Sequence, residues 1–198
     1  MLSPFITIDG NIGSGKSSIL LELHKIYKYN VDLEPVDKWL PHLTKLYTED
    51  KGYFEFQKIV WEDRCWLQSK KKDNTPIILE RSPFFTRNTF MNVLHSDKKL
   101  TDEEMIILNE MYDLTDKLWK PRIYIYLKTS PTVSFKRIEN RNRISENLIK
   151  FNYIENLHNA YEDAYKKGLK QKLNIHIINT DDKTVEDITN IIYQIIKF

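Results

Sequence analysis

Apolar residues along the chain form two kinds of pattern, which predict alternating strands and helices. Short apolar runs suit buried strands, beginning with Ile6, Thr7 and Ile8, which precede a glycine-rich segment. The other predicted strands are residues 30–34, 75–80, 122–128 and 174–179. Longer stretches with helical spacing are residues 16–29, 37–48, 53–71, 84–95, 101–119, 131–141, 150–171 and 184–198.

Helices between successive strands indicate an α/β fold with a mostly parallel sheet. Parallel strands need crossover connections, so five strands separated by helices predict a five-stranded sheet with helices on both faces. Thr101 and Glu104 have capping-box spacing and mark the start of one long helix. No stretch has the composition of a linker, so we expect residues 1–198 to form one domain. Ligands of such sheets bind beyond the carboxyl ends of the strands.

The segment GNIGSGKSS, residues 10–18, has the spacing of a phosphate-binding loop between a strand and a helix. Its glycines allow positive φ and let backbone amides face a polyphosphate. The lysine of this motif reaches the β- and γ-phosphates, and the serine hydroxyl after it holds Mg²⁺. The residues predicted to bind ATP are Gly10, Asn11, Ile12, Gly13, Ser14, Gly15, Lys16, Ser17 and Ser18. A nucleoside triphosphate is therefore the expected ligand.

Carboxylates follow two other predicted strands. Glu34 and Glu80 each end a strand, as the phosphate loop does, so all three are expected to meet in one crevice. Arg81 comes directly after Glu80 and is available for the transferred phosphoryl group or for holding Glu34. Together these residues favour phosphoryl transfer over simple binding.

A basic cluster lies in the helix predicted over 131–141 and just beyond it. Arg137 and Arg141 are four residues apart on one helical face, and Arg143 follows the helix. Such a run is more often a solvated face, but in a phosphotransferase it fits an arginine-rich lid that closes over the phosphates. We expect the lid and count these arginines among the ATP-binding residues.

Composition limits the partners and the compartment. The chain has 198 residues, with 30 Lys and Arg against 28 Asp and Glu, a net charge of +2. No strong field draws nucleic acid or a membrane surface, so neither is an expected partner. Cys65 is the only cysteine. Because the first predicted strand begins within a few residues of Met1 and no apolar run is long enough to span a bilayer, we expect neither a signal peptide nor a membrane-spanning segment. We expect a cytoplasmic protein.

The blocks DGNIGSGKSS, EPVDKW, YFEFQ, ERS and RIENRNRISE, in this order and spacing, resemble the deoxyribonucleoside kinase family. That family includes deoxycytidine, deoxyguanosine and mitochondrial thymidine kinases and the insect multisubstrate enzyme. The resemblance covers nearly the whole chain. It implies a P-loop kinase fold, transfer of the γ-phosphoryl group of ATP to the 5′-hydroxyl of a deoxynucleoside, Mg²⁺ as cofactor, and usually a homodimer.

The resemblance also implies roles for individual residues. Glu34 matches the general base of the family. A neutral 5′-hydroxyl needs such a base, whereas the carboxylate would repel the phosphate of a nucleoside monophosphate. Arg81 matches the residue that holds Glu34 and the reacting phosphate, and Glu80 one that positions Mg²⁺ with Ser17. Lys16 completes the catalytic set. The 3′-hydroxyl pair is matched by Tyr47 and Glu146.

Base recognition is predicted from helix spacing together with the resemblance. Gln57 and Arg64 are seven residues apart, hence on one face with Val60 between them. An amide offers a donor and an acceptor to the Watson–Crick edge of a base. Trp39 is expected to line the pocket, Phe90 to stack on the base, and Thr86 to lie beside Arg64 and Val60. Relatives that prefer cytidine or guanosine pair an arginine with an aspartate, whereas Thr86 replaces that aspartate here. We therefore expect a pyrimidine-leaning kinase that accepts thymidine and deoxycytidine.

Three other functions remain open at this point. A thymidylate or other nucleoside monophosphate kinase shares the fold but brings an anionic phosphate to the position of Glu34. A P-loop switch or ATPase would need a Walker B aspartate, yet the predicted strands end in Glu80 and Lys128. A non-catalytic nucleotide-binding module would have no need of Glu34 and Arg81.

Overall fold

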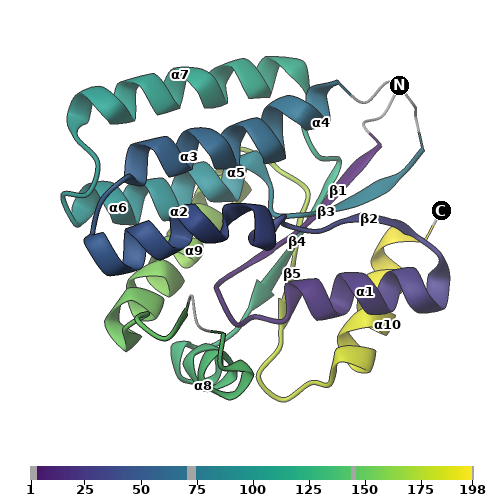
Figure 1. Cartoon of the computed structure of the whole chain (residues 1–198). Helices are drawn as coiled ribbons and strands as arrows, with labels where there is room; N and C mark the ends of the chain where they lie inside the picture. The colour runs from purple at the N-terminus through teal and green to yellow at the C-terminus, as the bar shows by residue number, and fades with distance from the viewer. Residues whose placement is uncertain (1–3, 71–74, 144–145, 198) are drawn as a thin grey trace.

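A computed structural model describes residues 4–70, 75–143 and 146–197 of the chain. Within these residues, five parallel strands form one sheet in the order β2, β3, β1, β4, β5 (Figure 1). The strands are β1 (Phe5–Gly10), β2 (Asn30–Asp32), β3 (Ile77–Glu80), β4 (Ile123–Lys128) and β5 (Ile175–Asn179). Each predicted strand is confirmed, with ends that differ by a residue or two.

Helices cover both faces of this sheet, as predicted. They are α1 (Lys16–Tyr27), α2 (Val36–Glu49), α3 (Tyr53–Trp61), α4 (Leu67–Ser69), α5 (Pro83–Thr86), α6 (Asn92–Ser96), α7 (Asp102–Leu118), α8 (Pro131–Arg141), α9 (Phe151–Lys170) and α10 (Val185–Ile196). In Figure 1, α1 and α10 lie on one side of the sheet, and α3, α5, α6, α7 and α9 lie on the other. Residues 71 and 198, predicted as helix ends, fall outside the described residues.

The helices predicted over 53–71 and 84–95 are not uniform. Each contains a π-helical segment, η1 (Glu62–Trp66) between α3 and α4 and η2 (Arg87–Met91) between α5 and α6. A π turn adds one residue to the turn and rotates everything after it relative to a regular α-helix. The sequence pattern did not predict these segments, and one of them changes where a candidate site residue points.

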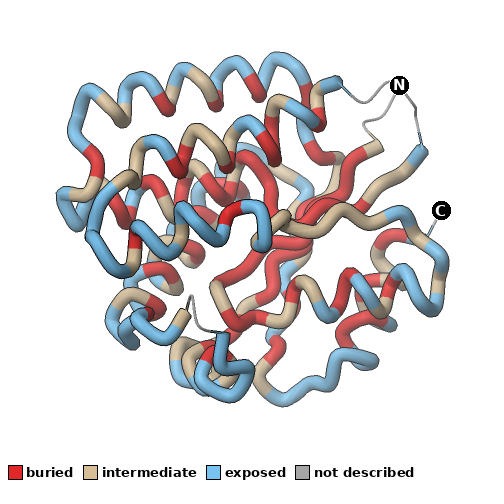
Figure 2. The backbone as a smooth tube through the Cα atoms, viewed as in Figure 1, coloured by how far each residue is buried: buried red, intermediate tan, exposed pale blue. Residues whose placement is uncertain are grey.

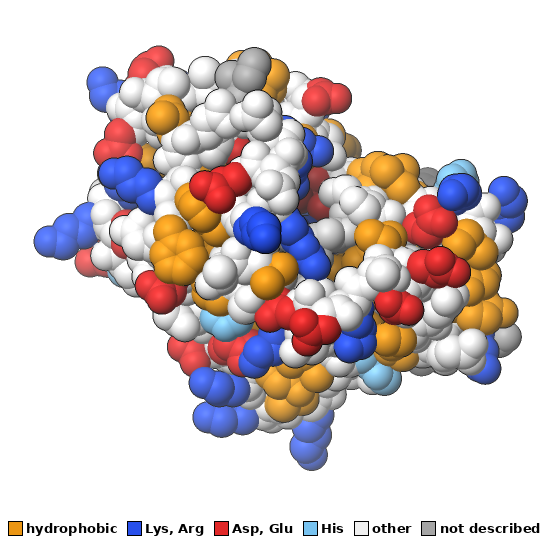
Figure 3. Space-filling model, turned by 90° about the horizontal axis from the view of Figure 1, so that it is seen from below, with side chains coloured by type: hydrophobic (Ala, Val, Ile, Leu, Met, Phe, Trp, Pro, Cys, Tyr) orange, Lys and Arg blue, Asp and Glu red, His pale blue; other side chains and the backbone are white. Residues whose placement is uncertain are grey.

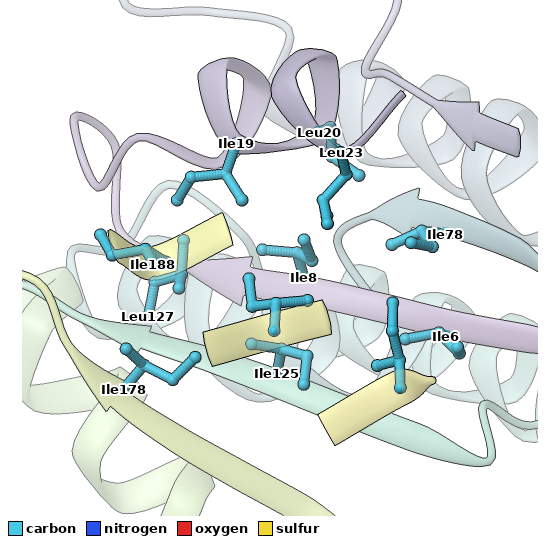
Figure 4. Packing of buried hydrophobic residues seen from close by; sticks show 12 residues of the cluster. Ile6, Ile8, Ile19, Leu20, Leu23, Ile78, Ile125, Leu127, Ile178 and Ile188 are labelled. Atoms are coloured by element: carbon cyan, nitrogen blue, oxygen red, sulfur yellow. The ribbon is translucent and has the colours of Figure 1, made fainter. Parts of the chain in front are cut away.

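Apolar side chains from four strands pack against α1 and α10 on one face of the sheet. The strands contribute residues such as Ile6, Ile8 and Ile125, which are fully buried, and α1 contributes Ile19 and Leu20 (Figure 4). The sheet is the buried centre of the fold, and buried and exposed residues alternate along the outer helices, so that each helix has a buried side and an exposed side (Figure 2). This packing fixes the strand from which the phosphate loop begins.

The opposite face of the sheet has an aromatic core. Tyr124 and Tyr126 from β4 pack with Phe85 and with Tyr161 from α9, and the rings of Tyr126 and Tyr161 stack with centroids 5.7 Å apart. Offset stacking and edge contacts of this kind add to the burial energy of the rings. The packing holds α9 against the sheet, close to the carboxyl ends of the strands.

The predicted capping box at the start of α7 is confirmed. The Thr101 hydroxyl accepts a hydrogen bond from the Glu104 backbone amide at 3.2 Å, and a Glu104 carboxylate oxygen accepts one from the Thr101 amide at 2.9 Å. These bonds satisfy amides that the first helical turn leaves without partners. Among the helices of the described residues, none has the length and apolar character that crossing a membrane requires.

Candidate active site

The segment between β1 and α1 forms the predicted loop. Gly13 has φ 78° and Gly15 has φ 90°, both in the left-handed region that glycine adopts without strain. A Cβ atom on Gly13 would lie 2.4 Å from the backbone oxygen of Ser134 in α8. Glycine is therefore required at position 13 by its conformation and by the close approach of α8.

A buried asparagine fastens the loop to α9. The side-chain amide of Asn11 donates to the backbone oxygen of Ile154 at 2.8 Å, and its oxygen accepts from the amide of Ile12 at 2.8 Å. Asn11 is 2% exposed, so these bonds are shielded from water. The loop is thus fixed at its start by β1, which it follows directly, and by the hydrogen bond from Asn11 to α9.

Lys16 is buried at the start of α1 with its ammonium turned back onto the loop. Its Nζ donates to the backbone oxygens of Gly10 at 3.2 Å and Asn11 at 3.0 Å and lies 4.0 Å from a carboxylate oxygen of Glu80. Burial, together with the nearby Arg81 charge, lowers the pKa of Lys16 to about 8. A polyphosphate bound in the loop would supply the compensating negative charge.

Ser17 and Glu80 lie together, as predicted for a magnesium site. The Ser17 hydroxyl donates to the Glu80 carboxylate, with Oγ 3.0 Å and 3.1 Å from its two oxygens. Mg²⁺ binds oxygen ligands and usually takes one or two protein groups together with substrate phosphates. Hydroxyl and carboxylate oxygens side by side at a phosphate loop fit that ion. Within the described ranges, no group of three or more His, Cys, Asp or Glu residues forms a metal site.

Glu34 and Arg81 form a buried ion pair. The Nε atom of Arg81 donates to a carboxylate oxygen of Glu34 at 2.7 Å, and their side chains are 8% and 12% exposed. Another guanidinium nitrogen donates to the Gly10 backbone oxygen at 2.9 Å and to the Tyr161 hydroxyl at 2.6 Å. Burial opposes the charge of Arg81, but the Glu34 carboxylate prevails and raises its pKa. The pair joins the phosphate loop to the strand end that carries Glu34.

The backbone of Arg81 is itself unusual, since its φ of 66° lies in the left-handed region. Such a conformation costs about 1–3 kcal/mol for a residue other than glycine and persists only where neighbours fix it. Here the Arg81 amide donates to the Ile8 backbone oxygen at 2.9 Å. A carboxylate oxygen of Asp9 accepts from the Ser82 amide at 2.7 Å and from its hydroxyl at 3.0 Å.

Sequence reasoning missed Asp9, which accepts hydrogen bonds from Ser82, and Tyr161, whose hydroxyl accepts one from Arg81. Asp9 is fully buried, and burial raises its pKa to about 6. A carboxylate inside an apolar strand directly before the glycine-rich loop was a usable signal for Asp9. Nothing in the sequence around Tyr161 distinguishes it from a core tyrosine, and burial likewise raises its pKa.

A cleft of about 820 Å³ opens at the carboxyl ends of the strands and contains most of the predicted site. Predicted residues that line it are Ile12, Gly13, Gly15, Lys16, Ser17, Ser18, Glu34, Trp39, Tyr47, Gln57, Val60, Glu80, Arg81, Thr86, Phe90, Arg141, Arg143 and Glu146. Seen from below, the surface is hollowed and carries basic and acidic side chains around the hollow (Figure 3). The volume suits a nucleotide together with a second small molecule.

The predicted sugar pair and the lid arginines lie next to one another. Arg141 donates to both carboxylate oxygens of Glu146 at 2.6 Å, and Arg143 lies 3.8 Å from the same carboxylate. Burial and then the Glu146 charge raise the pKa of Tyr47 to about 12, so its hydroxyl keeps its proton. The cleft therefore presents a donor and an acceptor at this position.

At its far end the cleft is lined by α2, α3 and α5. The indole nitrogen of Trp39 donates to Asp63 at 2.8 Å and the ring packs edge-on against Phe56. Gln57 is 3% exposed, and its side-chain oxygen has no hydrogen-bond partner among the described residues. A buried amide oxygen without a partner costs free energy unless a ligand meets it. Phe90 lies under Arg81, whose guanidinium carbon is 4.6 Å from the ring centroid.

Two predicted placements are wrong. Arg64 was expected beside Val60 and Thr86, but its guanidinium bonds to Asp32, to the Leu33 backbone oxygen and to that of Glu80. The π segment η1 turns it away from the face that carries Val60, whereas the prediction assumed a regular α-helix.

Arg137 is the second correction. It was expected with Arg141 over the phosphates, but its guanidinium donates to the backbone oxygen of Thr180 at 3.0 Å, just beyond β5. Four residues along a helix bring two side chains to the same face, but the Arg137 side chain is long enough to turn toward the Thr180 carbonyl. Gly10, the last residue of β1, and the loop residues Asn11 and Ser14 do not line the cleft.

The parallel sheet, the phosphate loop with Lys16, and the Glu34–Arg81 pair in the same cleft define a P-loop phosphotransferase. Comparison with known proteins supports this class and narrows it to one family. Residues 6–198 match the deoxynucleoside kinase family. The chain is 32% identical over 191 residues, 92% of its length and 81% of the relative's, to a probable deoxycytidine kinase of Fowlpox virus. It is 27% identical to the deoxyguanosine kinase of Bacillus subtilis, over 95% of this chain and 91% of that one.

A solved structure of the deoxyadenosine kinase from M. mycoides with bound dCTP shares the fold. The two superpose with a TM-score of 0.80 at 28% identity, over 96% of this chain and 99% of the other. The chain belongs to the deoxynucleoside kinase family. It is a kinase with a P-loop kinase fold, and kinases of this family take ATP as phosphate donor.

Proposed function

We propose that this kinase transfers the γ-phosphoryl group of ATP to the 5′-hydroxyl of pyrimidine deoxynucleosides, thymidine and deoxycytidine, and releases ADP. The observation that carries the proposal is the Glu34–Arg81 pair at 2.7 Å, in the same cleft as the phosphate loop. A neutral hydroxyl is a poor nucleophile and needs a nearby base, and a carboxylate there disfavours an acceptor that already carries a phosphate.

Each residue of the loop side has a place in this reaction. Glu34 accepts the proton of the 5′-hydroxyl, while Arg81 holds Glu34 and faces the transferred phosphoryl group. Lys16 and the loop amides neutralise the β- and γ-phosphates, where negative charge must be stabilised. Ser17 and Glu80 would hold Mg²⁺, which would neutralise phosphate charge when bound.

The other side of the cleft orients the nucleoside. Tyr47 donates to and Glu146 accepts from the 3′-hydroxyl. Arg141 and Arg143 act as the lid, and leave Glu146 for the phosphates once ATP is bound. Two guanidinium nitrogens of Arg141 donate to the two carboxylate oxygens of Glu146. Because the arginine must release this carboxylate before it can bind a phosphate, the exchange couples sugar binding to lid closure.

The base is recognised by Gln57 inside a pocket lined by Trp39, Val60 and Phe90. The Gln57 amide offers a donor and an acceptor, and it serves cytosine or thymine by turning its amide. Thr86 carries no charge and is therefore neutral toward either base. These side chains support a broad preference for pyrimidines over a strict choice between two of them.

A substrate panel tests the proposal. The purified protein is given ATP and Mg²⁺ with each of the four deoxynucleosides, and separately with thymidine and deoxycytidine 5′-monophosphates. We expect ADP formation with thymidine and deoxycytidine above that with the purine nucleosides and the monophosphates. Activity on purine nucleosides alone would refute the base assignment, and activity on the monophosphates alone would refute the 5′-hydroxyl as acceptor.

We further propose that the chain acts as one domain, works in the cytoplasm as a homodimer, and pairs through α7. Exposed apolar side chains on this helix support the pairing, since Ile107, Leu114 and Leu118 recur at helical spacing and are 47%, 42% and 46% exposed. Cys65 is a buried free thiol, which suits a reducing compartment. Sedimentation equilibrium at micromolar concentration tests the pairing, which a monomeric mass would refute.

A further inference from the structure

The guanidinium of Arg64 fastens the ends of two strands to each other. One nitrogen donates to a carboxylate oxygen of Asp32 at 2.6 Å and to the Leu33 backbone oxygen at 3.2 Å. The other donates to the backbone oxygens of Asp32 at 3.1 Å and Glu80 at 3.0 Å. Arg64 is 5% exposed, so this set of bonds, which we call the Arg64 clamp, is shielded from water. Bonds from a charged donor are roughly twice as strong as neutral ones.

The π segment explains why Arg64 reaches this place. In a regular α-helix, Arg64 would share the face of Gln57, seven residues earlier. A π turn holds one more residue than an α turn, which changes the direction of the side chains within it and after it. Gln57 and Val60 in α3 line the cleft, whereas Arg64 within η1 points to the ends of β2 and β3.

The clamp holds the backbone on either side of the Glu34–Arg81 pair. Asp32 and Leu33 lead directly into Glu34, and Glu80 leads directly into Arg81. The strand before Glu34, β2, has three residues and lies at the edge of the sheet, so strand pairing holds this segment on one side alone. An arginine inside the fold supplies the fixation that so short an edge strand lacks.

A neighbouring glutamine completes the clamp. The Gln68 side-chain amide donates to the second carboxylate oxygen of Asp32 at 2.9 Å. Asp32 is thereby held by two side chains of the same helical segment, from η1 and α4. The Asp32 carboxylate is a fixed counter-charge for Arg64, and it keeps the arginine away from the cleft.

We propose that Arg64 is a positioning residue, which sets the distance between Glu34 and the phosphoryl group by clamping Asp32 to Glu80, and that it does not contact the base. The inference rests on the proposed function of Glu34 as general base. Misplacement of a catalytic group by about 1 Å costs on the order of 10²-fold in rate, so a lost clamp acts on turnover. Binding of ATP in the loop, which β1 and α9 hold, is unaffected.

Steady-state kinetics of Arg64→Met and Arg64→Lys test the proposal. We expect kcat with deoxycytidine to fall by at least about tenfold in Arg64→Met, with KM for ATP within about twofold of the parent. Lysine keeps the charge but not the fork, so Arg64→Lys should fall between the parent and Arg64→Met. The ratio of thymidine to deoxycytidine turnover should stay that of the parent. Arg87→Met is the matched control, since Arg87 pairs with Asn109 and Asp113 away from the cleft.

A double-mutant comparison separates positioning from a general loss of structure. If Arg64 acts through Glu34, Arg64→Met should cost less than about threefold in a Glu34→Gln background, where no base remains to be positioned. Equal losses in both backgrounds would overturn the proposal, and so would unchanged kcat in Arg64→Met or a shifted thymidine to deoxycytidine ratio. Where Arg64→Met does not fold, Arg64→Lys carries the same comparison. A parent without nucleoside-dependent ADP formation would refute the proposed function instead.

Discussion

Replacement of Glu34 by glutamine isolates the charge of the proposed base from its shape. Glutamine has nearly the same volume and keeps an oxygen that can accept a hydrogen bond from Arg81. In the parent, the Arg81 Nε atom lies 2.7 Å from the Glu34 carboxylate oxygen. Arg81 also keeps its bonds to the Gly10 oxygen and the Tyr161 hydroxyl. What is lost is the proton acceptor and the counter-charge of a buried guanidinium.

The loss of the proton acceptor lowers turnover, and the loss of the counter-charge lowers the free energy of unfolding. Removing a general base lowers turnover by about 10²- to 10⁴-fold. Removing one partner of a buried ion pair costs about 3–5 kcal/mol of stability when nothing replaces it. Because glutamine retains the hydrogen bond and Glu80 also stabilises the Arg81 charge, we expect a loss of no more than about 3 kcal/mol here. The kinetic effect should therefore far exceed the effect on folding.

The assay is nucleoside-dependent ADP formation, together with denaturant unfolding of the same preparations. Glu34→Gln should lower kcat by at least about 10²-fold and change KM for ATP by less than about threefold. Glu34→Ala, which also deletes the acceptor for Arg81, should be no more active and less stable. A folded Glu34→Gln protein with kcat within about threefold of the parent would refute the role of Glu34 as base.

Further predictions concern other parts of the cleft. Lys16→Ala should abolish turnover with the fold intact by circular dichroism, and near-normal turnover would contradict the role of the loop. Arg141→Ala should lower kcat more than it raises the nucleoside KM. Kinetics equal to the parent would mean that Arg141 lies on a solvated helix face and does not act as a lid. Thr86→Asp should cut thymidine use relative to deoxycytidine by about 1–3 kcal/mol in kcat/KM, because a carboxylate accepts from a cytosine amino group and repels a thymine oxygen, and an unchanged ratio would contradict it. Asp9 has a pKa of about 6 in the folded protein against 3.8 otherwise, so its proton stabilises the fold below pH 4 and that stability is lost as pH rises through 6. Between pH 4 and 7 the stability of the parent should therefore fall by about 2 kcal/mol relative to Asp9→Asn, measured by urea unfolding, and a constant difference would contradict the assignment.

The sequence predicted the architecture well because its signals are local. Strand patterns, the capping box at Thr101 and the spacing of the glycine-rich loop depend on neighbouring residues, and the structure has each of them. Glu34 and Glu80 were also predictable, because the ends of parallel strands meet at one edge of a sheet whatever lies between them. The strand topology alone was therefore enough to predict that these distant residues lie close together, without information on their contacts.

The errors have a different physical origin. Arg64 was misplaced by a single extra residue in a helical turn, which the hydrophobic pattern does not record. Arg137 found a backbone oxygen beyond β5 that no helical wheel includes. Tyr161 supports Arg81 across 80 positions of sequence, and such a contact depends on how α9 packs on the sheet. Long flexible side chains and non-local packing are what the linear pattern leaves open.

The most direct test of phosphoryl transfer to the 5′-hydroxyl follows the phosphorus atom itself. ATP labelled in its γ-phosphoryl group is incubated with the protein, Mg²⁺ and deoxycytidine, and in parallel with 2′,5′-dideoxycytidine, which lacks the accepting hydroxyl. We expect labelled deoxycytidine 5′-monophosphate in the first reaction and no labelled nucleotide product in the second. Label released as inorganic phosphate at the same rate with either nucleoside would contradict it, because water and not the 5′-hydroxyl would then be the acceptor.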